Sequence, residues 1–290
     1  MPELPEVETV CRSLRHFVID QTITGLQILH KKSFICDSKF TVINKTIKGI
    51  QRRGKFIILV LDDGNFVVTH LKMTGQLLYK GSSSTNDLAG GGHPASDTLE
   101  QLPGKHTRII YDLRGRSGEC SQLFFNDMRI FGWMKVVDKF GLAEMFAALG
   151  PDANDPTVDA EALYARLQRK RLPIKQTIMD NKLWTGVGNI YASEILFEVG
   201  VDPRTPSNKI SLATWKKIIF VTRKILDAAV AAGGTTFDGR YVDALGRAGD
   251  FERALQVYGR AGENCRCCGT ILENVKLGGR SSIYCPRCQK

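Results

Sequence analysis

The chain begins with MPELPEVETV, residues 1–10, in which prolines and carboxylates precede an apolar run. Proline is tolerated at the first positions of a helix because its missing N–H would be unpaired there anyway. Carboxylates are favourable at the same positions because they face the positive end of the helix dipole. The stretch therefore predicts a helix from about Pro5 to Phe17 that leads into the first domain.

The same stretch places reactive groups at the end of the chain. If Met1 is removed, Pro2 presents a secondary amine beside the carboxylates of Glu3 and Glu6. A terminal amine has a reference pKa of about 7.7–8.0, against about 10.4 for lysine, so far more of it is unprotonated at neutral pH. Such an amine can attack a sugar C1′ or an aldehyde and form an iminium. For these residues alone, a well-started helix remains the simpler interpretation.

The composition favours a polyanionic partner. The 290 residues, enough for two or three domains, include 40 Lys+Arg against 30 Asp+Glu, which gives a formal net charge of +10 and a pI near 9.2. That balance suits nucleic acid or an anionic membrane surface. No apolar run approaches the roughly 18 residues of a membrane span, so we expect no transmembrane helix. The acidic start also lacks the features of a signal peptide.

Short β-branched and aromatic runs follow the first helix and favour an all-β first domain, either a sandwich or a barrel. Asp62-Asp63-Gly64-Asn65, between two of these runs, is typical of a hairpin turn. The predicted strands are Thr22–Leu29, Phe40–Ile50, Phe56–Leu61, Phe66–Leu71, Arg108–Leu113, Gln122–Asn126 and Phe131–Val137.

One stretch within this domain has a different composition. Residues 81–104, GSSSTNDLAGGGHPASDTLEQLPG, are rich in Gly, Ser and Asp. Such a stretch buries too little apolar surface to order itself, so we expect a flexible loop. An insertion without a role of its own is the simpler interpretation, and a specialised role remains open.

From about residue 138 onward the apolar spacing becomes helical. Trp184–Asn189, WTGVGN, predicts a glycine-bearing turn, with Asn189 as the N-cap of the next helix and Gly200 as its stop. N–H groups exposed at such a helix start suit a phosphate, and Lys170 and Lys175 nearby strengthen this hypothesis. The predicted helices are Lys139–Leu149, Val158–Arg169, Ile174–Asp180, Ile190–Val199 and Leu212–Ala232.

The tail carries the most specific local pattern. Cys265-x2-Cys268 and Cys285-x2-Cys288 are separated by sixteen residues, the arrangement of a closed, structural four-cysteine zinc site on a β-hairpin. Cys267 lies between two ligands and is expected to be spare. Clustered cysteines suit a reducing cytoplasm better than a disulfide framework. Lys and Arg outnumber Asp and Glu by seven to two over residues 253–290, which favours contact with nucleic acid. A zinc hairpin on a merely solvated face remains an alternative.

Together these pieces resemble one family, the formamidopyrimidine-DNA glycosylases (Fpg), over nearly the whole chain. The start is the most diagnostic piece, because PELPE stands here where the related endonuclease VIII branch has PEGPE. The resemblance implies an α+β multidomain chain that grips duplex DNA. Its parts are an N-terminal β-sandwich with a leading helix, a helical helix-two-turn-helix domain and a C-terminal four-cysteine zinc β-hairpin. The other matching segments are RRGKF around Lys55, HLKMTG around Met73, MDNKL and GVGNIYASE within 179–194, GGTT at 233–236, QVYGRAGENCRCCG and the final YCPRCQK.

The resemblance also implies roles for four residues. Pro2 is the expected nucleophile at C1′, and Glu3 is the expected general acid on the sugar oxygen. Lys55 is expected to assist β-elimination, and Arg260 matches the position assigned to δ-elimination. The implied enzyme is a bifunctional glycosylase and AP lyase of base-excision repair that removes 8-oxoguanine and formamidopyrimidines. It needs no cofactor beyond one structural Zn²⁺.

Flipping a nucleotide out of a duplex costs a few kcal/mol, and the emptied space has to be filled. The family fills it with a Met, an Arg and a Phe, which fall here on Met73, Arg129 and Phe131. From the residues alone, Met73 and Phe131 are better interpreted as core. The expected DNA-binding set is completed by Glu6 and by the backbone-contacting positions His106, Lys170, Lys175, Asn189 and Arg280.

The predicted domains are a catalytic β-sandwich (1–137), a linker with a connecting helix (138–153), a helix-two-turn-helix domain (154–245) and a zinc hairpin (246–290). We expect a monomer that acts on damaged double-stranded DNA in the cytoplasm, without a membrane or a nucleotide cofactor.

Two segments depart from the family pattern, the 81–104 insertion and the stretch 237–251, which follows Thr235 and Thr236. Because these threonines open the segment that closes over the flipped base in the family, the lesion spectrum stays open. One alternative is the same chemistry on oxidised pyrimidines. Another is a non-catalytic protein that binds DNA damage on the same scaffold, although binding alone requires neither Pro2 nor Lys55.

Overall fold

The computed structural model describes residues 1–81, 88–92, 102–235, 242–243 and 251–290. The chain folds into two compact units. The first comprises Met1–Ala148 with Ala232–Asp250, and the second comprises Leu149–Ala231 with Phe251–Lys290. The bounds of the four segments predicted from the sequence stay predictions. In the described part of the chain, no helix is both long and apolar enough to cross a membrane.

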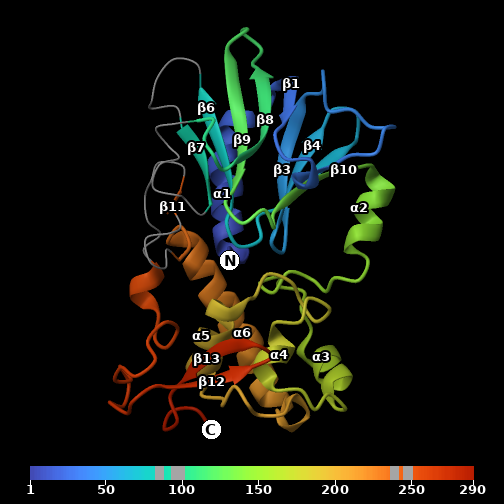
Figure 1. Cartoon of the computed structure of the whole chain (residues 1–290). Coiled ribbons are helices and arrows are strands. Elements are labelled where there is room, and N and C mark those ends of the chain that lie inside the picture. Colours follow the sequence, from blue (N-terminus) through green and yellow to red (C-terminus); the bar gives the residue numbers. More distant parts are fainter. Residues whose placement is uncertain (82–87, 93–101, 236–241, 244–250) are drawn as a thin grey trace. The chain divides into compact units, whose positions relative to one another are not determined.

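Two β-sheets and two α-helices build the described part of the first unit (Figure 1). Neighbouring strands in these sheets run antiparallel, except that β2 and β10 run parallel to each other. One sheet has the order β1 (Thr22–Ile28), β8 (Thr107–Arg114), β9 (Cys120–Asp127), β6 (Gly75–Gly81), β7 (Leu88–Gly92) and β11 (Val242–Asp243). The other has the order β2 (Phe34–Ile35), β10 (Trp133–Val137), β5 (Phe66–His70), β4 (Phe56–Leu61) and β3 (Ile47–Arg53).

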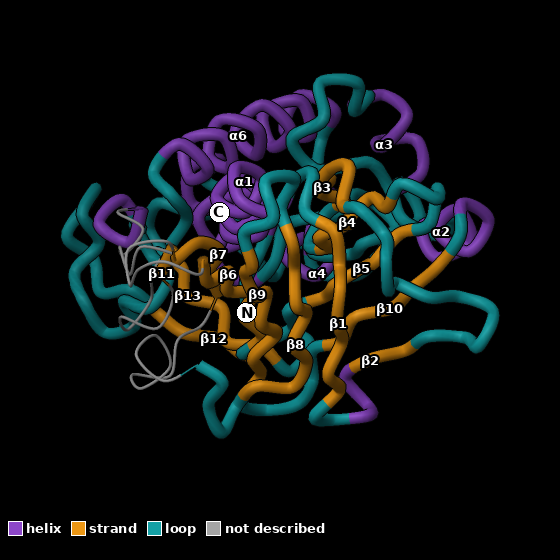
Figure 2. The backbone as a smooth tube through the Cα atoms, turned by 90° about the horizontal axis from the view of Figure 1, so that it is seen from above, coloured by secondary structure: helices purple, strands orange, loops and turns teal. Residues whose placement is uncertain are grey.

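Helix α1 (Leu4–Val18) lies against both sheets, and in Figure 2 it is seen beside β6 and β7. Val7, Val10, Leu14 and Val18 recur at helical spacing and are fully buried. They share one core with apolar residues from both sheets. The predicted β-sandwich with a leading helix is therefore confirmed, and so is the helix predicted at the start of the chain.

Two strand predictions need correction. The predicted strand Phe40–Ile50 is wrong in its first half, because the chain turns there and strand β3 begins only at Ile47, after a single bridge between Thr46 and Thr22. Asn44 adopts φ +61°, a left-handed conformation that asparagine tolerates, and its N–H bonds to the carbonyl of Ile23. Strand β6 was not predicted, although its first five residues, from Gly75 to Tyr79, are buried. Its sequence, GQLLYKG, sets Leu77 and Leu78 side by side and so breaks the alternation that marks a half-exposed strand.

The insertion is not wholly a loop. Its residues Leu88–Gly92 form β7, which pairs with β6 on one side and with β11 on the other. β11 belongs to the stretch 237–251 that departs from the family pattern, and the rest of that stretch up to Asp250 lies outside the described residues. Backbone pairing thus joins the two unusual segments of the chain.

The second unit is helical and ends in a hairpin. Trp184 and Trp215 pack edge to face, with ring centroids 6.4 Å apart, and both are buried. Helix α5 begins one residue earlier than predicted, with Gly188 rather than Asn189 as the N-cap, and ends at Gly200 with φ +84°. The helices of the second unit are α3 (Ala160–Leu167), α4 (Ile174–Ile178), α5 (Asn189–Val199) and α6 (Leu212–Ala231), and its hairpin consists of β12 (Glu273–Leu277) and β13 (Arg280–Tyr284). Helix α2 (Lys139–Phe146) belongs to the first unit.

Candidate active site and nucleic-acid interface

The N-terminal residues are buried and tightly hydrogen-bonded. Glu3 and Glu6 are each 2% exposed, and Pro2 is buried beside them. Glu6 Oε2 accepts the backbone N–H of Glu3 at 2.8 Å, as in a capping box. Glu6 Oε1 accepts the N–H of Thr235, also at 2.8 Å. One carboxylate therefore fixes the start of α1 and joins it to the glycine turn before Thr235, while Met1 remains half-exposed.

Lys55 lies in a turn that is tied to the same helix. Glu8 on α1 pairs with Arg52 (Oε2 to Nε, 2.9 Å), and Arg52 donates through Nη1 to the carbonyl of Gly54 at 3.1 Å. Burial works against ionisation of Glu8, but Arg52, Arg12 and Arg15 together hold its pKa below the usual value. This chain of contacts sets the turn just before Lys55, whose side chain is nearly buried.

Close to Lys55, His70 on β5 is neutral. Burial, helped by the charges of Lys72 and Lys55, lowers its pKa to about 3. Its Nδ1 accepts the N–H of Lys72 at 3.0 Å, which requires an unprotonated nitrogen there. A neutral imidazole next to two lysines avoids adding a third positive charge.

Met73, Arg129 and Phe131 lie on two exposed loops, and their side chains touch. Met73 is 41% exposed and Phe131 52% exposed, which core residues would not be. The guanidinium of Arg129 donates to Met73 Sδ at 3.2 Å and lies 4.9 Å from the centre of the Phe131 ring. His106 is half-buried, and its carbonyl accepts the N–H of Asp127. The structure brings these four predicted residues to neighbouring loops at one end of β6, β8 and β9.

In the second unit, two predicted residues converge on one backbone carbonyl. Lys175 Nζ donates to the carbonyl of Ser281 at 3.2 Å and to Ser193 Oγ at 2.8 Å, and Asn189 Nδ2 donates to the same carbonyl at 3.1 Å. Lys175 is only 2% exposed, so its ammonium links α4, α5 and β13. Arg280, next to Ser281, is exposed.

Lys170 and Arg260 already have partners within the protein. Lys170 Nζ pairs with Asp180 Oδ2 at 2.7 Å and holds the pKa of that carboxyl below its usual value against the effect of burial. Arg260 donates to Glu263 and to the carbonyls of Gln256 and Asn264.

Four cysteines form a site whose dimensions fit one tetrahedral metal ion. The Sγ atoms of Cys265, Cys268, Cys285 and Cys288 all lie within 4.8 Å of one another. Zn–S bonds of about 2.3 Å in a tetrahedron place sulfurs about 3.8 Å apart. The Cys268–Cys285 and Cys265–Cys288 separations are 3.5 and 3.9 Å. Cys267 is exposed and outside the cluster, as predicted. The four thiols fit zinc, which would act as a structural ion here.

Comparisons with known proteins agree with this geometry. Residues 1–134 match the formamidopyrimidine-DNA glycosylase N-terminal domain, residues 149–240 its H2TH domain, and residues 262–290 the zinc finger found in FPG and IleRS. The formamidopyrimidine-DNA glycosylase of Thermomicrobium roseum is 36% identical and that of Synechocystis sp. 37% identical. Each alignment covers 100% of this chain and at least 98% of the relative.

The chain belongs to the formamidopyrimidine-DNA glycosylase family. Two solved structures of the Lactococcus lactis Fpg, one in complex with Fapy-dG-containing DNA and one with abasic-site DNA, each match with a TM-score of 0.84 at 27% identity. Both matches cover 99% of this chain and at least 99% of the other. The predicted family, the helix-two-turn-helix domain and the zinc finger are thereby confirmed.

Three residues that organise the site were not singled out from the sequence of this family member. Asp127 and Thr74 organise the exposed loops, and Glu194, 5% exposed on α5, accepts three backbone N–H groups from residues 256–258. For Asp127 a signal was present, since an aspartate just before a turn that ends in glycine is typical of a side chain that caps backbone N–H groups. Nothing in the local spacing around Glu194 pointed to its partners.

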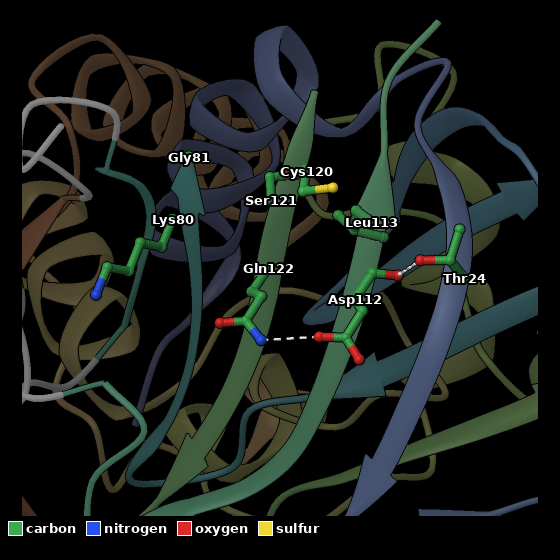
Figure 3. A pocket seen from close by; sticks show the side chains of 8 residues that line it. All are labelled: Thr24, Lys80, Gly81, Asp112, Leu113, Cys120, Ser121 and Gln122. Atoms are coloured by element: carbon green, nitrogen blue, oxygen red, sulfur yellow. Dashed lines mark hydrogen bonds between the residues drawn. The ribbon is translucent and has the colours of Figure 1, made fainter. Parts of the chain in front are cut away.

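A hollow of about 400 Å³ lies elsewhere on the first unit, on the six-stranded sheet of this glycosylase-family member (Figure 3). Across it, Gln122 Nε2 donates to Asp112 Oδ1 at 2.8 Å, and Thr24 Oγ1 donates to the carbonyl of Asp112 at 3.3 Å. None of the predicted site residues lines this hollow.

Proposed function

We propose that this chain is a bifunctional DNA glycosylase and AP lyase of base-excision repair, with Pro2 as its nucleophile. It removes oxidised purines, 8-oxoguanine and formamidopyrimidines, from double-stranded DNA. The observation that carries the proposal is the fixed start of the chain, where Glu6 holds both the backbone of Glu3 and that of Thr235. A reactive amine needs such a fixed position to approach one sugar carbon repeatedly.

The reaction follows from the terminal amine. Removal of Met1 frees the nitrogen of Pro2, which attacks C1′ while the base leaves with the electrons of the glycosidic bond. The Pro2 nitrogen gives up the proton that the departing base takes up. Glu3 protonates the sugar oxygen as the ring opens, and the nitrogen lone pair then forms the iminium. Loss of a C2′ proton then expels the 3′ phosphate, and a second elimination expels the 5′ phosphate. Lys55 assists the first elimination and Arg260 the second, once DNA has displaced the internal partners of Arg260.

DNA is held by residues from both units. Met73, Arg129 and Phe131 fill the space that the flipped nucleotide leaves, and Glu6 contributes to the same DNA-binding set. Phosphates are held by His106, Lys170, Asn189 and Arg280. Lys175 contributes to DNA binding through these residues, because its buried ammonium and Asn189 hold the same carbonyl of Ser281, next to Arg280. We further propose that the protein acts as a monomer in the cytoplasm, where a four-thiolate zinc site stays reduced.

The deciding experiment is borohydride trapping on an 8-oxoguanine duplex, followed by mapping of the adduct. The wild-type protein should give a covalent adduct at Pro2 on chains that lack Met1. Pro2→Gly should lose at least about 100-fold in excision rate, because the nucleophile is changed, while its DNA affinity stays within a few-fold. Pro5→Gly is the matched control, since it alters the same helix start and leaves the terminal amine intact.

Three outcomes would change the proposal. An adduct only with oxidised-pyrimidine DNA would keep the chemistry and replace the substrate. Tight DNA binding without any adduct, on a correctly processed terminus, would favour a non-catalytic damage-binding protein. Wild-type excision by Pro2→Gly would remove the nucleophile from Pro2.

A further inference from the structure

Asp127, the last residue of β9, has a fully buried carboxylate with three donors around it. Its Oδ1 accepts the hydroxyl of Thr74 and the backbone N–H of Arg129, the latter at 3.1 Å. Its Oδ2 accepts the N–H of Gly132 at 2.6 Å. Thr74 Oγ1 in turn accepts the N–H of Arg129 at 3.0 Å. One side chain therefore joins the loop that carries Met73 to the loop that carries Arg129 and Phe131.

The backbone of Asp127 joins a third segment. Its N–H donates to the carbonyl of His106 at 2.9 Å, and its own carbonyl accepts Arg108 Nε at 2.8 Å. The segments that meet at this residue carry His106, Met73, Arg129 and Phe131, four of the predicted DNA-binding residues. These segments are separated by some twenty to fifty positions in the sequence.

Both loops contain backbone that would not hold its shape unaided. Lys72 and Ile130 adopt φ +53° and +57°, a left-handed conformation that is unfavourable for residues with a Cβ and most unusual for β-branched isoleucine. Ile130 is 39% exposed, so apolar burial contributes little to keeping it there. Such conformations persist only where surrounding contacts enforce them. Around Ile130 these contacts are the hydrogen bonds of Arg129 and Gly132 to Asp127, whereas the N–H of Lys72 is held by His70 Nδ1.

Glycine at position 132 is part of the same arrangement. A Cβ at Gly132 would lie 2.8 Å from the Phe125 ring and 3.1 Å from Asp127 Oδ2. Only glycine lets this N–H come so close to the carboxylate. The turn after Phe131 is therefore shaped to reach Asp127.

We propose that Asp127 is a positioning residue that holds Met73, Arg129 and Phe131 ready to enter the duplex as the damaged nucleotide leaves it. The inference rests on the proposed function, in which these three side chains fill the vacated space. Asp127 is buried and does not itself touch DNA. Because Arg129 already contacts both Met73 and Phe131, a preset arrangement reduces the ordering that insertion would otherwise require.

Asp127→Asn is the most informative change, because it keeps the size of the side chain and removes one acceptor. A carboxylate offers acceptor sites only, which suits three donors, whereas an amide directs its own N–H groups at one of them. A buried donor left without its acceptor is destabilising, so this change should destabilise the two loops that Asp127 holds.

The experiment compares two substrates under single-turnover conditions. In one, the lesion is paired within the duplex, and in the other it lies in a bulge and is already unstacked; a fluorescent base analogue beside the lesion reports opening. Asp127→Asn should slow opening and excision of the paired lesion by about tenfold or more and change excision from the bulge by less than about threefold.

Three further variants keep the test decisive. Asp112→Asn makes the same chemical change on neighbouring β8, at the hollow in Figure 3, and should affect neither substrate. If Asp127→Asn does not fold, Thr74→Val removes one donor of the same arrangement and should show the same difference between substrates. Thr74→Ser keeps the hydroxyl and should restore the wild-type ratio.

The possible results distinguish the positioning role of Asp127 from the proposed function of the protein. Equal slowing of both substrates, or wild-type opening in both Asp127→Asn and Thr74→Val, would overturn the positioning role while the proposed function stands. A wild-type protein that excises neither lesion would overturn the proposed function itself, and the inference with it.

Discussion

At the scale of single residues, this site depends on which polar groups are kept charged and which neutral. Glu8 stays ionised because three arginines surround it, whereas His70 stays neutral because it is buried beside two lysines. Cys11 lies in the core near Glu8, and burial raises the pKa of its thiol to about 12. That cysteine is therefore an apolar packing residue and not a second nucleophile.

His70 gives a prediction for the pH dependence of stability. Its folded pKa of about 3 lies below the value of about 6.5 expected in the unfolded chain. As the pH falls below 6.5, the unfolded chain binds a proton that the folded protein does not, so stability is lost down to about pH 3. The free energy of unfolding should decrease by up to about 1.4 kcal/mol per pH unit from this residue alone.

His70→Asn keeps an acceptor for the N–H of Lys72 and removes the titration. Urea unfolding between pH 7 and 4 should therefore show a steeper loss of stability for the wild type than for the variant. The carboxylates titrate in both proteins, so only the difference between the two curves tests His70. Parallel curves would show that His70 is not held neutral in the folded protein.

At the scale of elements, a buried acid anchors residues 256–258, just before the zinc site, to helix α5. Glu194 on α5 accepts the N–H groups of Gln256, Val257 and Tyr258 at 2.7, 3.0 and 2.8 Å. Burial raises its pKa even though these bonds favour the charged form. Val257 packs in one cluster with Cys265 and Cys285, so the anchor lies directly next to the metal ligands.

Glu194→Gln should weaken this anchor by leaving one backbone donor without its acceptor. We expect a loss of about 1–3 kcal/mol in stability and faster zinc release to a chelator. Glu198→Gln, one turn further along α5, is the matched control, because its exposed pair with Lys224 (3.3 Å) contributes less than about 1 kcal/mol. Zinc release that is equally fast in both variants would contradict the anchoring role.

At the scale of the whole molecule, the zinc hairpin and the helical domain both carry more basic than acidic residues. Removing the ion should disorder the hairpin, because the binding energy of a structural metal is also folding energy. Contacts between its Lys and Arg side chains and phosphates would then be lost, which lowers affinity and flattens the dependence of binding on salt.

Cys268→Ser should therefore lose zinc and much of its DNA affinity together, with a smaller slope of log affinity against log salt. Cys267→Ser, the neighbouring thiol outside the cluster, should keep both. Metal content by mass spectrometry and DNA binding at several salt concentrations would test this. A Cys268→Ser protein that has lost its metal yet binds DNA normally would show that the metal-bound hairpin is not needed for DNA binding.

The sequence by itself determined the features that depend on local spacing. The apolar period of α1, the glycine stop of α5 and the two CxxC pairs are each encoded within a few residues, since a helix repeats every 3.6 residues and a metal site gathers short loops. The resemblance at the start of the chain also sufficed to predict Pro2 and Glu3 as site residues, and that assignment awaits experiment.

The tertiary structure alone decided which polar groups meet. Thr74 and Asp127, Glu6 and Thr235, and Lys175 and Ser281 lie 53, 229 and 106 positions apart in the sequence. No local period encodes such pairs, because they form only when separate elements pack and their buried donors need acceptors. For the same reason, the sequence predicted a loop where β7 pairs with β6 and β11, since a glycine-rich strand depends on the backbone edges beside it.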